Sequence, residues 1–296
     1  MEEKVIRNIL DNWHLGKVLS VLRIRQGFAN HNFKVVTGLG QYVLRLCRQR
    51  EAEDLLPEVE LARVLVRHGI PTPLPLPDRH GKAIVVTPAG PAVLFPWVEG
   101  VHPPPGPGML REAGRLLGRL HSVPGREVPR RPNTLQPESC RQLVAGTGSG
   151  PCLDEDLRHA WLTIFREVSP HLDPKLPHGP VHGDLFPDNL LVREGEIVAL
   201  LDLEEFAWDV LLFDVGMTLN GFCFRGNRYD RRAAGLLLAA YEEVRPFTAA
   251  ERRCLDAWVR WSALAMACWH IRDCQRHGPQ PGQPQRIREL ILRSLS

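Results

Sequence analysis

The residues of this chain that are best equipped for chemistry lie in segment 181–189, whose sequence is Val-His-Gly-Asp-Leu-Phe-Pro-Asp-Asn. It places Asp184 five positions before Asn189, and Asp202 follows thirteen positions later, after an apolar run. Carboxylate and carboxamide oxygens suit Mg²⁺, which also keeps water and phosphate oxygens as ligands. Phosphoryl transfer needs positioning, charge neutralisation and a group that accepts the hydroxyl proton. Asp184 is the candidate proton acceptor, and Asn189 and Asp202 are candidate metal ligands.

A β-hairpin is expected to bring the two candidate metal ligands together. Short β-prone runs at 190–193 and 196–201 flank Glu194-Gly195, a pattern typical of a hairpin. With a two-residue turn there, Asn189 lies opposite Leu200, and Asp202 follows at the same open end of the hairpin. One Asp or Asn alone is more often a turn former, but the whole set at this spacing favours a phosphotransfer site.

Composition and charge exclude several classes of protein. The 296 residues can form one large domain or two lobes, and the formal net charge of +3 comes without a basic stripe for nucleic acid. The charged start has no apolar run behind it, and no segment is apolar enough for a membrane span, so neither a signal peptide nor a membrane partner is expected. The seven cysteines are scattered without a C-x-x-C pair, which favours reduced thiols and a cytoplasmic location over disulfides or zinc.

Strand-like segments dominate the first third of the chain, and helix-like segments dominate the rest. After a helix at 4–13, strands are expected at 21–25, 33–37, 41–47, 83–87 and 92–95, with a helix at 58–68. Further helices are expected at 109–121, 154–168, 210–222, 229–244, 249–275 and 284–295, and 124–151 is expected to be a surface loop. This order predicts an α+β protein with a small N-terminal sheet lobe, 1–96, and a larger, mostly helical C-terminal lobe, 97–296.

Two pairs of residues, one on a loop of the expected sheet lobe and one at the boundary between the lobes, are candidates for nucleotide binding. Gly27 and Asn30 lie on a loop between two strands, where backbone N–H groups could face phosphates. An ordinary hairpin turn is the alternative interpretation of this loop. Phe95 and Trp97, at the lobe boundary, could form an apolar wall for the base or pack a hinge.

The strand at 41–47 offers a surface for both base and phosphates. Period-two alternation places Val43 and Arg45 on one face, an apolar residue followed by a cation. Arg45 taken alone could equally be a solvated edge residue. Glu58, on the next helix, is the ion-pair partner expected to hold Arg45 in place.

These segments resemble the aminoglycoside phosphotransferase and choline kinase superfamily, which has a protein-kinase-like fold. The chain is most similar to homoserine kinases of the second type, nearly from end to end. The resemblance is carried by segments 13–16, 27–44, 68–73, 116–121, 182–189, 209–214 and 219–224. It implies a kinase that transfers the γ-phosphoryl group of ATP, with Mg²⁺, to the hydroxyl of a small molecule.

The resemblance also implies a role for each motif residue. Asp184 corresponds to the catalytic base, and Asn189 and Asp202 correspond to the Mg²⁺ ligands. Arg45 takes the place of the phosphate-binding Lys, with a bidentate group instead of a point charge. Asp214 resembles a buried residue that braces the catalytic loop.

The acceptor is expected to bind the C-terminal helices, as in the superfamily that the chain resembles. Segment 251–296 has four acidic residues against eight Arg, which disfavours a polycationic aminoglycoside. A zwitterionic amino acid such as homoserine needs a cation for its carboxylate and an acid for its ammonium group. Arg260 and Arg272 are candidates for the first, and Glu205 and Asp209 for the second.

Other functions remain open at this point. Choline or ethanolamine could be held in an aromatic cage built from Trp258, Trp261 and Trp269, although aromatic residues on a helix are more often core. An antibiotic kinase and an inactive nucleotide-binding pseudokinase are further alternatives. The pseudokinase would be favoured by loss of Asp184, Asn189 or Asp202, and all three residues are present. A protein kinase is disfavoured because no Ala-Pro-Glu segment follows Asp202.

Overall fold

The computed structural model describes residues 3–24, 30–47, 50–104 and 106–295. The chain separates into two compact units, one formed by Met1–Val101 with Leu191–Glu204 and the other by His102–Leu190 with Glu205–Ser296. The first unit contains a five-stranded sheet and the second is mainly helical, which confirms the predicted α+β class. Unlike the two predicted continuous lobes, the first unit also takes in the later segment Leu191–Glu204.

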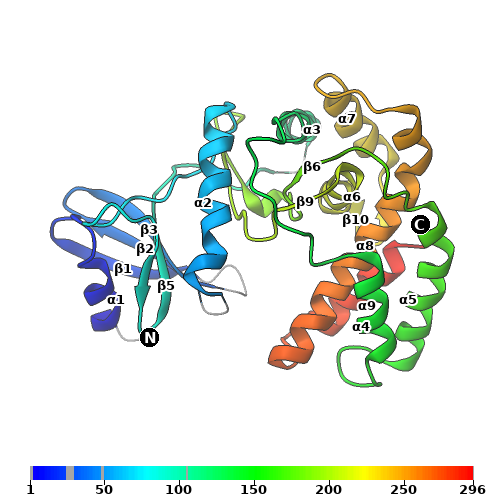
Figure 1. Cartoon of the computed structure of the whole chain (residues 1–296), viewed down its shortest axis with the longest axis horizontal. Coiled ribbons are helices and arrows are strands. Elements are labelled where there is room, and N and C mark those ends of the chain that lie inside the picture. Colours follow the sequence, from blue (N-terminus) through cyan, green and yellow to red (C-terminus); the bar gives the residue numbers. More distant parts are fainter. Residues whose placement is uncertain (1–2, 25–29, 48–49, 105, 296) are drawn as a thin grey trace. The chain divides into compact units, whose positions relative to one another are not determined.

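An antiparallel sheet forms the centre of the first unit, with the strand order β1-β2-β3-β5-β4 (Figure 1). Its strands are β1 (Val18–Ile24), β2 (Asn30–Thr37), β3 (Gly40–Cys47), β4 (Val85–Thr87) and β5 (Gly90–Pro96). On β3, Leu44 and Leu46 are fully buried against a core that includes α1 (Glu3–Leu10), whereas Val43 and Arg45 alternate with them. The predicted placement of Val43 and Arg45 on one face is therefore confirmed.

Helix α2 (Ala52–Arg67) begins six residues before the predicted start at Glu58. The prediction stopped at Pro57, which lacks a backbone N–H and disfavours a helix interior. In the structure Pro57 lies inside the helix beyond its first turn, so the Glu53 carbonyl lacks the usual intrahelical donor. Asp54 accepts a hydrogen bond of 3.1 Å from the Glu51 N–H, which secures the added turn. Leu55 on this turn is buried with Val93 of the sheet.

Seven α-helices make up most of the described part of the second unit (Figure 1). They are α3 (Pro107–His121), α4 (Pro137–Gly146), α5 (Glu155–Val168), α6 (Leu211–Phe222), α7 (Arg231–Glu242), α8 (Ala249–His277) and α9 (Gln283–Arg293). The longest, α8, packs against both α6 and α9. Trp161, Phe165 and Trp261 form an aromatic core between α5 and α8, with the Phe165 and Trp261 ring centroids 5.8 Å apart.

The expectation of a surface loop throughout 124–151 is wrong, because this segment contains α4. Its first residue, Pro137, is a favourable start for a helix because the missing N–H would have no intrahelical partner there. Cys140 and Val144, one turn apart, are buried. The many Pro and Gly residues around α4 hid this short apolar stripe.

The expectation of reduced cysteines is wrong for one pair. A disulfide joins Cys152 and Cys274, whose Cα atoms lie 6.4 Å apart. These residues are 122 positions apart in the sequence, so their spacing could not reveal the pairing. Cys47, Cys140 and Cys223 are buried free thiols.

Three two-stranded sheets complete the described structure, and two of them flank the motif residues. β6 (His178–Val181) pairs with β9 (Ala207–Val210), β7 (Leu190–Arg193) with β8 (Glu196–Leu200), and β10 (Phe224–Arg225) with β11 (Arg228–Tyr229). The predicted turn between β7 and β8 is confirmed, because Glu194 and Gly195 have φ angles of 55° and 87°. Among the described residues, no helix has both the length and the apolar character that crossing a membrane requires.

Candidate active site

The loop that follows β6 carries Asp184 and Asn189, and its first turn depends on Gly183. This glycine has a φ of +78°, and a Cβ atom built on it would lie 2.7 Å from the backbone oxygen of Glu205. Both the left-handed conformation and the close backbone approach therefore require glycine. A short 3₁₀ turn, Pro187–Asn189, ends the loop.

Within the loop, Asn189 is held directly against Asp184. The Asn189 side-chain nitrogen donates hydrogen bonds of 2.8 Å to the backbone oxygen and to the carboxylate of Asp184. This pattern assigns the amide nitrogen to Asp184, so that the amide oxygen is left without a hydrogen bond to any described residue. An amide oxygen presented in this way is a suitable ligand for Mg²⁺.

Asp214 braces the loop that carries Asp184 and Asn189, as the resemblance implies for this buried residue. This fully buried residue of α6 accepts hydrogen bonds from the backbone N–H groups of His182, at 2.7 Å, and Gly183, at 2.9 Å. Its carboxylate also lies 3.2 Å from His121 Nε2, and His121 Nδ1 lies 2.8 Å from the Tyr241 hydroxyl. We refer to Asp214, His182, Gly183, His121 and Tyr241 as the Asp214 network.

Protonation in the Asp214 network follows from burial. Burial lowers the pKa of His121 despite the neighbouring Asp214, so the imidazole is neutral near pH 7. A neutral ring donates from Nε2 to Asp214 and accepts at Nδ1 from the Tyr241 hydroxyl. Burial opposes the charge of Asp214, but hydrogen bonds from His121 and His182 outweigh it and lower the pKa. The loop is thus held by a charged acceptor whose partners all donate to it.

Asp202 follows β8 and belongs to the first unit. Its φ angle of 56° lies in the left-handed region, where residues other than glycine are uncommon and Asp is among the better tolerated. Unusual backbone conformations of this type concentrate at functional sites. Whether Asp202 shares a metal ion with Asn189 stays a prediction. The described residues contain no cluster of three or more His, Cys, Asp or Glu side chains suited to a metal ion.

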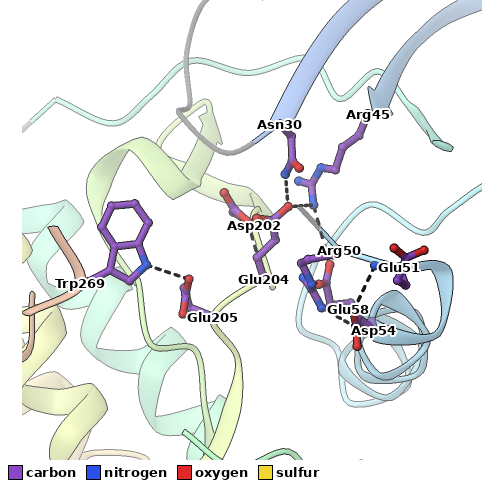
Figure 2. Close-up of polar contacts among 10 residues, drawn as sticks. All are labelled: Asn30, Arg45, Arg50, Glu51, Asp54, Glu58, Asp202, Glu204, Glu205 and Trp269. Carbon is purple, nitrogen blue, oxygen red and sulfur yellow. Dashed lines mark hydrogen bonds and ion pairs between the residues drawn. The ribbon is translucent and has the colours of Figure 1, made fainter. Parts of the chain in front are cut away.

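Arg45 lies among acidic and basic side chains that meet near Asp202 (Figure 2). Its guanidinium is 3.8 Å from the Glu58 carboxylate and 3.4 Å from that of Glu204. Arg50 forms a closer ion pair with Glu58, and the Asn30 amide donates to Glu204. We refer to Asn30, Arg45, Arg50, Glu58 and Glu204 as the Arg45 cluster.

Negative charge exceeds positive charge around Arg45 once Asp202 is included. Burial disfavours the guanidinium charge, but Asp202, Glu204 and Glu58 outweigh it and raise the pKa of Arg45. Burial, with a contribution from Asp202, raises the pKa of Glu204 to about 7. Burial also raises the pKa of Glu58, against the effect of Arg50. The predicted pair of Arg45 and Glu58 therefore exists, but each residue has a nearer partner.

The predicted wall for the base gathers on the same face of the sheet as Arg45. Val43 is directly opposite Phe95 in the pairing of β3 with β5, and the Arg45 guanidinium lies 5.4 Å from the Phe95 ring centroid. On the other side, Val43 pairs with Lys34 of β2, whose ammonium lies 3.8 Å from the Trp97 ring. Apolar rings and cations thus alternate on one surface. Gly27 lies outside the described residues, and the Asn30 amide is engaged with Glu204, so phosphate binding by that loop stays a prediction.

Three residues of this surface were missed by the sequence analysis. Lys34 could have been found, because a turn at 38–39 pairs positions that sum to 77, and 34 then faces 43. The sequence did not indicate Glu204 or Arg50. Both lie in segments without regular periodicity, where the direction of a side chain cannot be predicted.

Among the predicted acceptor-binding cations, Arg260 and Arg272 have different surroundings. Arg260 donates to the backbone oxygen of Ser294, at 2.7 Å, and to the Glu167 carboxylate, at 2.9 Å. These contacts tie α8 to the end of the chain and to α5, and they occupy the guanidinium. Arg272 forms no hydrogen bond or ion pair with another described residue and stays a candidate.

The two predicted acids also differ. The Asp209 carboxylate accepts hydrogen bonds from the side-chain amides of Asn133, at 2.7 Å, and Gln136, at 3.1 Å. It thereby fastens the segment before α4 to β9. Glu205 accepts a hydrogen bond from Trp269 Nε1, at 3.0 Å (Figure 2), and has no ion-pair partner among the described residues.

The aromatic cage expected for a choline kinase does not form from Trp258, Trp261 and Trp269. Trp261 is fully buried in the core with Trp161 and Phe165, and Trp258 is 4% exposed. Two of the three rings are therefore inaccessible to a ligand. Trp269 alone remains partly exposed.

Solved structures with the same fold include proteins named as kinases. An amicoumacin kinase superimposes with a TM-score of 0.76 at 14% identity, covering 100% of this chain and 94% of that one. A microcompartment-associated aminopropanol kinase gives a TM-score of 0.76 at 18% identity, covering 99% and 95%. The predicted kinase-like fold is confirmed by these similarities.

Sequence comparison gives the family. The model of the phosphotransferase enzyme family matches residues 20–247, and the chain therefore belongs to that family. A homoserine kinase of Rhizobium meliloti is 33% identical over 277 residues, covering 92% of this chain and 84% of that protein. A homoserine kinase of Methylobacterium radiotolerans is 32% identical over 278 residues, covering 92% and 86%.

Proposed function

We propose that this protein transfers the γ-phosphoryl group of Mg-ATP to the hydroxyl of homoserine or a similar small amino-containing alcohol. The names of relatives that match over most of the chain support homoserine as the acceptor. The observation that carries the reaction type is the pairing of Asp184 with Asn189 on a loop held by Asp214.

The proposed reaction assigns one step to each residue of the catalytic loop. Asp184 orients the acceptor hydroxyl and accepts its proton as the oxygen attacks the γ-phosphorus. Asn189 fixes the rotamer of Asp184 through its amide nitrogen. The amide oxygen of Asn189 and the carboxylate of Asp202 would hold Mg²⁺. When bound, this ion neutralises charge that develops on the phosphates.

The first unit is proposed to bind the nucleotide. Val43, Phe95 and Trp97 supply an apolar surface for the base, and Arg45 supplies a cation for the phosphates. Phosphate oxygens would replace part of the carboxylate environment that now surrounds Arg45. The amicoumacin kinase of the same fold was solved with AMP-PNP and Ca²⁺, which supports nucleotide use.

The proposed acceptor is zwitterionic, and Arg272 is the cation available for its carboxylate. Arg260 is engaged in holding α8, so it is not carried into the proposal. Action in the cytoplasm, without nucleic acid or membrane as partner, stays a prediction.

The test is ATP consumption with Mg²⁺ across homoserine, choline, ethanolamine, 3-aminopropan-1-ol, methylthioribose and kanamycin. We expect turnover with homoserine or a close analogue, and loss of at least about a hundredfold in kcat for Asp184→Asn, in the range typical of general-base removal. Asp188→Asn is a matched control, because Asp188 is an exposed carboxylate of the same loop. Nucleotide binding without turnover on any of these compounds would favour the inactive pseudokinase.

A further inference from the structure

Glu205 lies directly against the loop that carries the proposed base. The backbone of Glu205 lies close to Gly183, as described above. A Cβ atom built on Gly183 would also lie 3.3 Å from the Cβ atom of Glu205. The side chain of Glu205 therefore starts beside the residue that precedes Asp184. Both belong to the second unit, so their proximity is a property of that unit alone.

The carboxylate of Glu205 is positioned by the indole of Trp269. Trp269 Nε1 donates a hydrogen bond of 3.0 Å to Glu205 Oε1 (Figure 2). Trp269 belongs to α8, and Ser262 on the same helix donates to the backbone oxygen of Phe213 at 3.1 Å, which ties α8 to α6. Helix α6 also carries Asp214, so the indole and the catalytic loop are held by one helix pair.

The charge of Glu205 is not balanced by an ion pair with any residue that the structure describes. Its carboxylate has no ion-pair partner among the described residues, and its hydrogen bond comes from a neutral donor to one of two oxygens. Asp209, a few positions later, has two side-chain amide donors. A partly buried carboxylate gains from a hydrogen-bonded cation, and an adjacent indole ring adds attraction for one. These features fit a ligand ammonium group.

Arg272 extends this arrangement along α8. It lies three residues after Trp269, so the two side chains lie on the same side of the helix. An acid at Glu205, an aromatic ring at Trp269 and a cation at Arg272 that pairs with no other described residue match an ammonium group and a carboxylate on one small molecule.

We propose that Glu205 and Trp269 form the subsite for the ammonium group of the acceptor. This inference rests on the proposed phosphotransfer function and assigns the residues that bind the amino end of the acceptor. Glu205 binds the ammonium through Oε2, while Trp269 fixes the carboxylate through Oε1.

The test compares homoserine with 4-hydroxybutyrate, which keeps the hydroxyl and the carboxylate but lacks the amine. In Glu205→Gln we expect KM for homoserine to rise about 10- to 100-fold, because a charged hydrogen bond is lost. The KM or inhibition constant of 4-hydroxybutyrate should stay within about twofold of the native value. Trp269→Phe keeps a ring without the N–H donor and should raise KM for homoserine by a smaller factor.

Asp256→Asn is the matched control, because Asp256 is an exposed carboxylate of α8, the helix that carries Trp269. Its KM for homoserine should equal that of the native protein. A Glu205→Gln enzyme with unchanged KM for homoserine would overturn the subsite. An equal rise in both constants would also overturn it, because the effect would then not depend on the amine.

Failure of the subsite is distinguishable from failure of the homoserine assignment. Calorimetric binding of 3-aminopropan-1-ol in the presence of Mg-AMP-PNP, lost in Glu205→Gln, would support the subsite even when homoserine is not phosphorylated. Phosphorylation of neutral alcohols as efficiently as their amino counterparts would overturn the subsite and leave the kinase function intact. Absence of binding by every ammonium compound would overturn it as well.

Discussion

The Asp214 network and the Arg45 cluster both hold residues proposed to act on phosphate transfer, but they are built from different interactions. In the Asp214 network, one buried carboxylate meets backbone N–H groups and a neutral imidazole. In the Arg45 cluster, side-chain charges meet other side-chain charges, and Arg45 is divided between Glu58 and Glu204.

This difference suits different tasks. Backbone donors cannot rotate away, so the Asp214 network keeps the loop of Asp184 in one conformation. Long charged side chains can change partners at little cost, because several ion pairs of similar geometry are available. The Arg45 cluster is therefore suited to reorganise when phosphate arrives, and the following predictions test that contrast.

The largest effect is expected for Asp214→Ala. Removing this carboxylate leaves His182 and Gly183 with unpaired buried N–H groups, and we expect the free energy of unfolding to fall by about 3–5 kcal/mol. Urea unfolding followed by circular dichroism measures this change. Thr248→Ala, which removes the N-cap of α8, should lower stability by only about 1 kcal/mol. Equal losses in the two variants would show that Asp214 is an ordinary structural residue.

Arg45→Gln is expected to change nucleotide binding more than stability. Arg50 still neutralises Glu58, and Asn30 still donates to Glu204, so the fold keeps its main contacts. KM for ATP should rise about 10- to 100-fold, because the phosphates lose a charged donor. Steady-state kinetics at saturating acceptor measures the change. A destabilised enzyme with native KM for ATP would contradict a phosphate role for Arg45.

The two regions should respond to pH in opposite directions. The folded pKa of His121 is lowered, so the stability that its neutral form supports is present above its unfolded value near 6.5 and is lost as pH falls below it. The folded pKa of Glu58 is raised, so its negative charge lowers the stability of the folded state at neutral pH. This loss of stability shrinks as pH falls toward 4.5 and the carboxylate takes up a proton. The free energy of unfolding, measured in urea at pH 5 and pH 7.5, gives the dependence of stability on pH. His121→Gln and Glu58→Gln should change this dependence in opposite directions. Changes in the same direction would remove the contrast.

Arg50→Gln should give the smallest effect. Glu58 would lose its closer cation and turn toward Arg45, which would hold the Arg45 guanidinium more firmly and raise KM for ATP by about two- to fivefold, as for a partly exposed ion pair. Arg63→Gln, on the exposed side of α2, is the matched control. An unchanged KM would mean that Arg50 does not regulate the partner of Arg45.

Periodicity was sufficient to predict most elements, because burial of one face repeats regularly along a strand or helix. The loop with Asp184 and Asn189 could be singled out from residue types, since both side chains lie within one short segment, and the proposed catalytic role of these residues stays a prediction. The partners of Arg260 and Asp209 were not, because Ser294 and Asn133 lie far away in the sequence and follow from packing of whole helices. The Cys152–Cys274 pair escaped for the same reason, whereas the short helix α4 was hidden by the Pro and Gly residues around it.

The first unit is discontinuous in the chain, and this has a consequence for the order in which the protein is made. A ribosome completes Met1–Val101, with all five strands of the sheet, long before it reaches Leu191–Glu204, so the first unit waits for nearly ninety residues before its last segment exists. During that interval Arg45 has Glu58 but not Glu204. A fragment that ends at Val101 is therefore an incomplete first unit. Separate expression of this unit should include Leu191–Glu204, joined to Val101 by a linker.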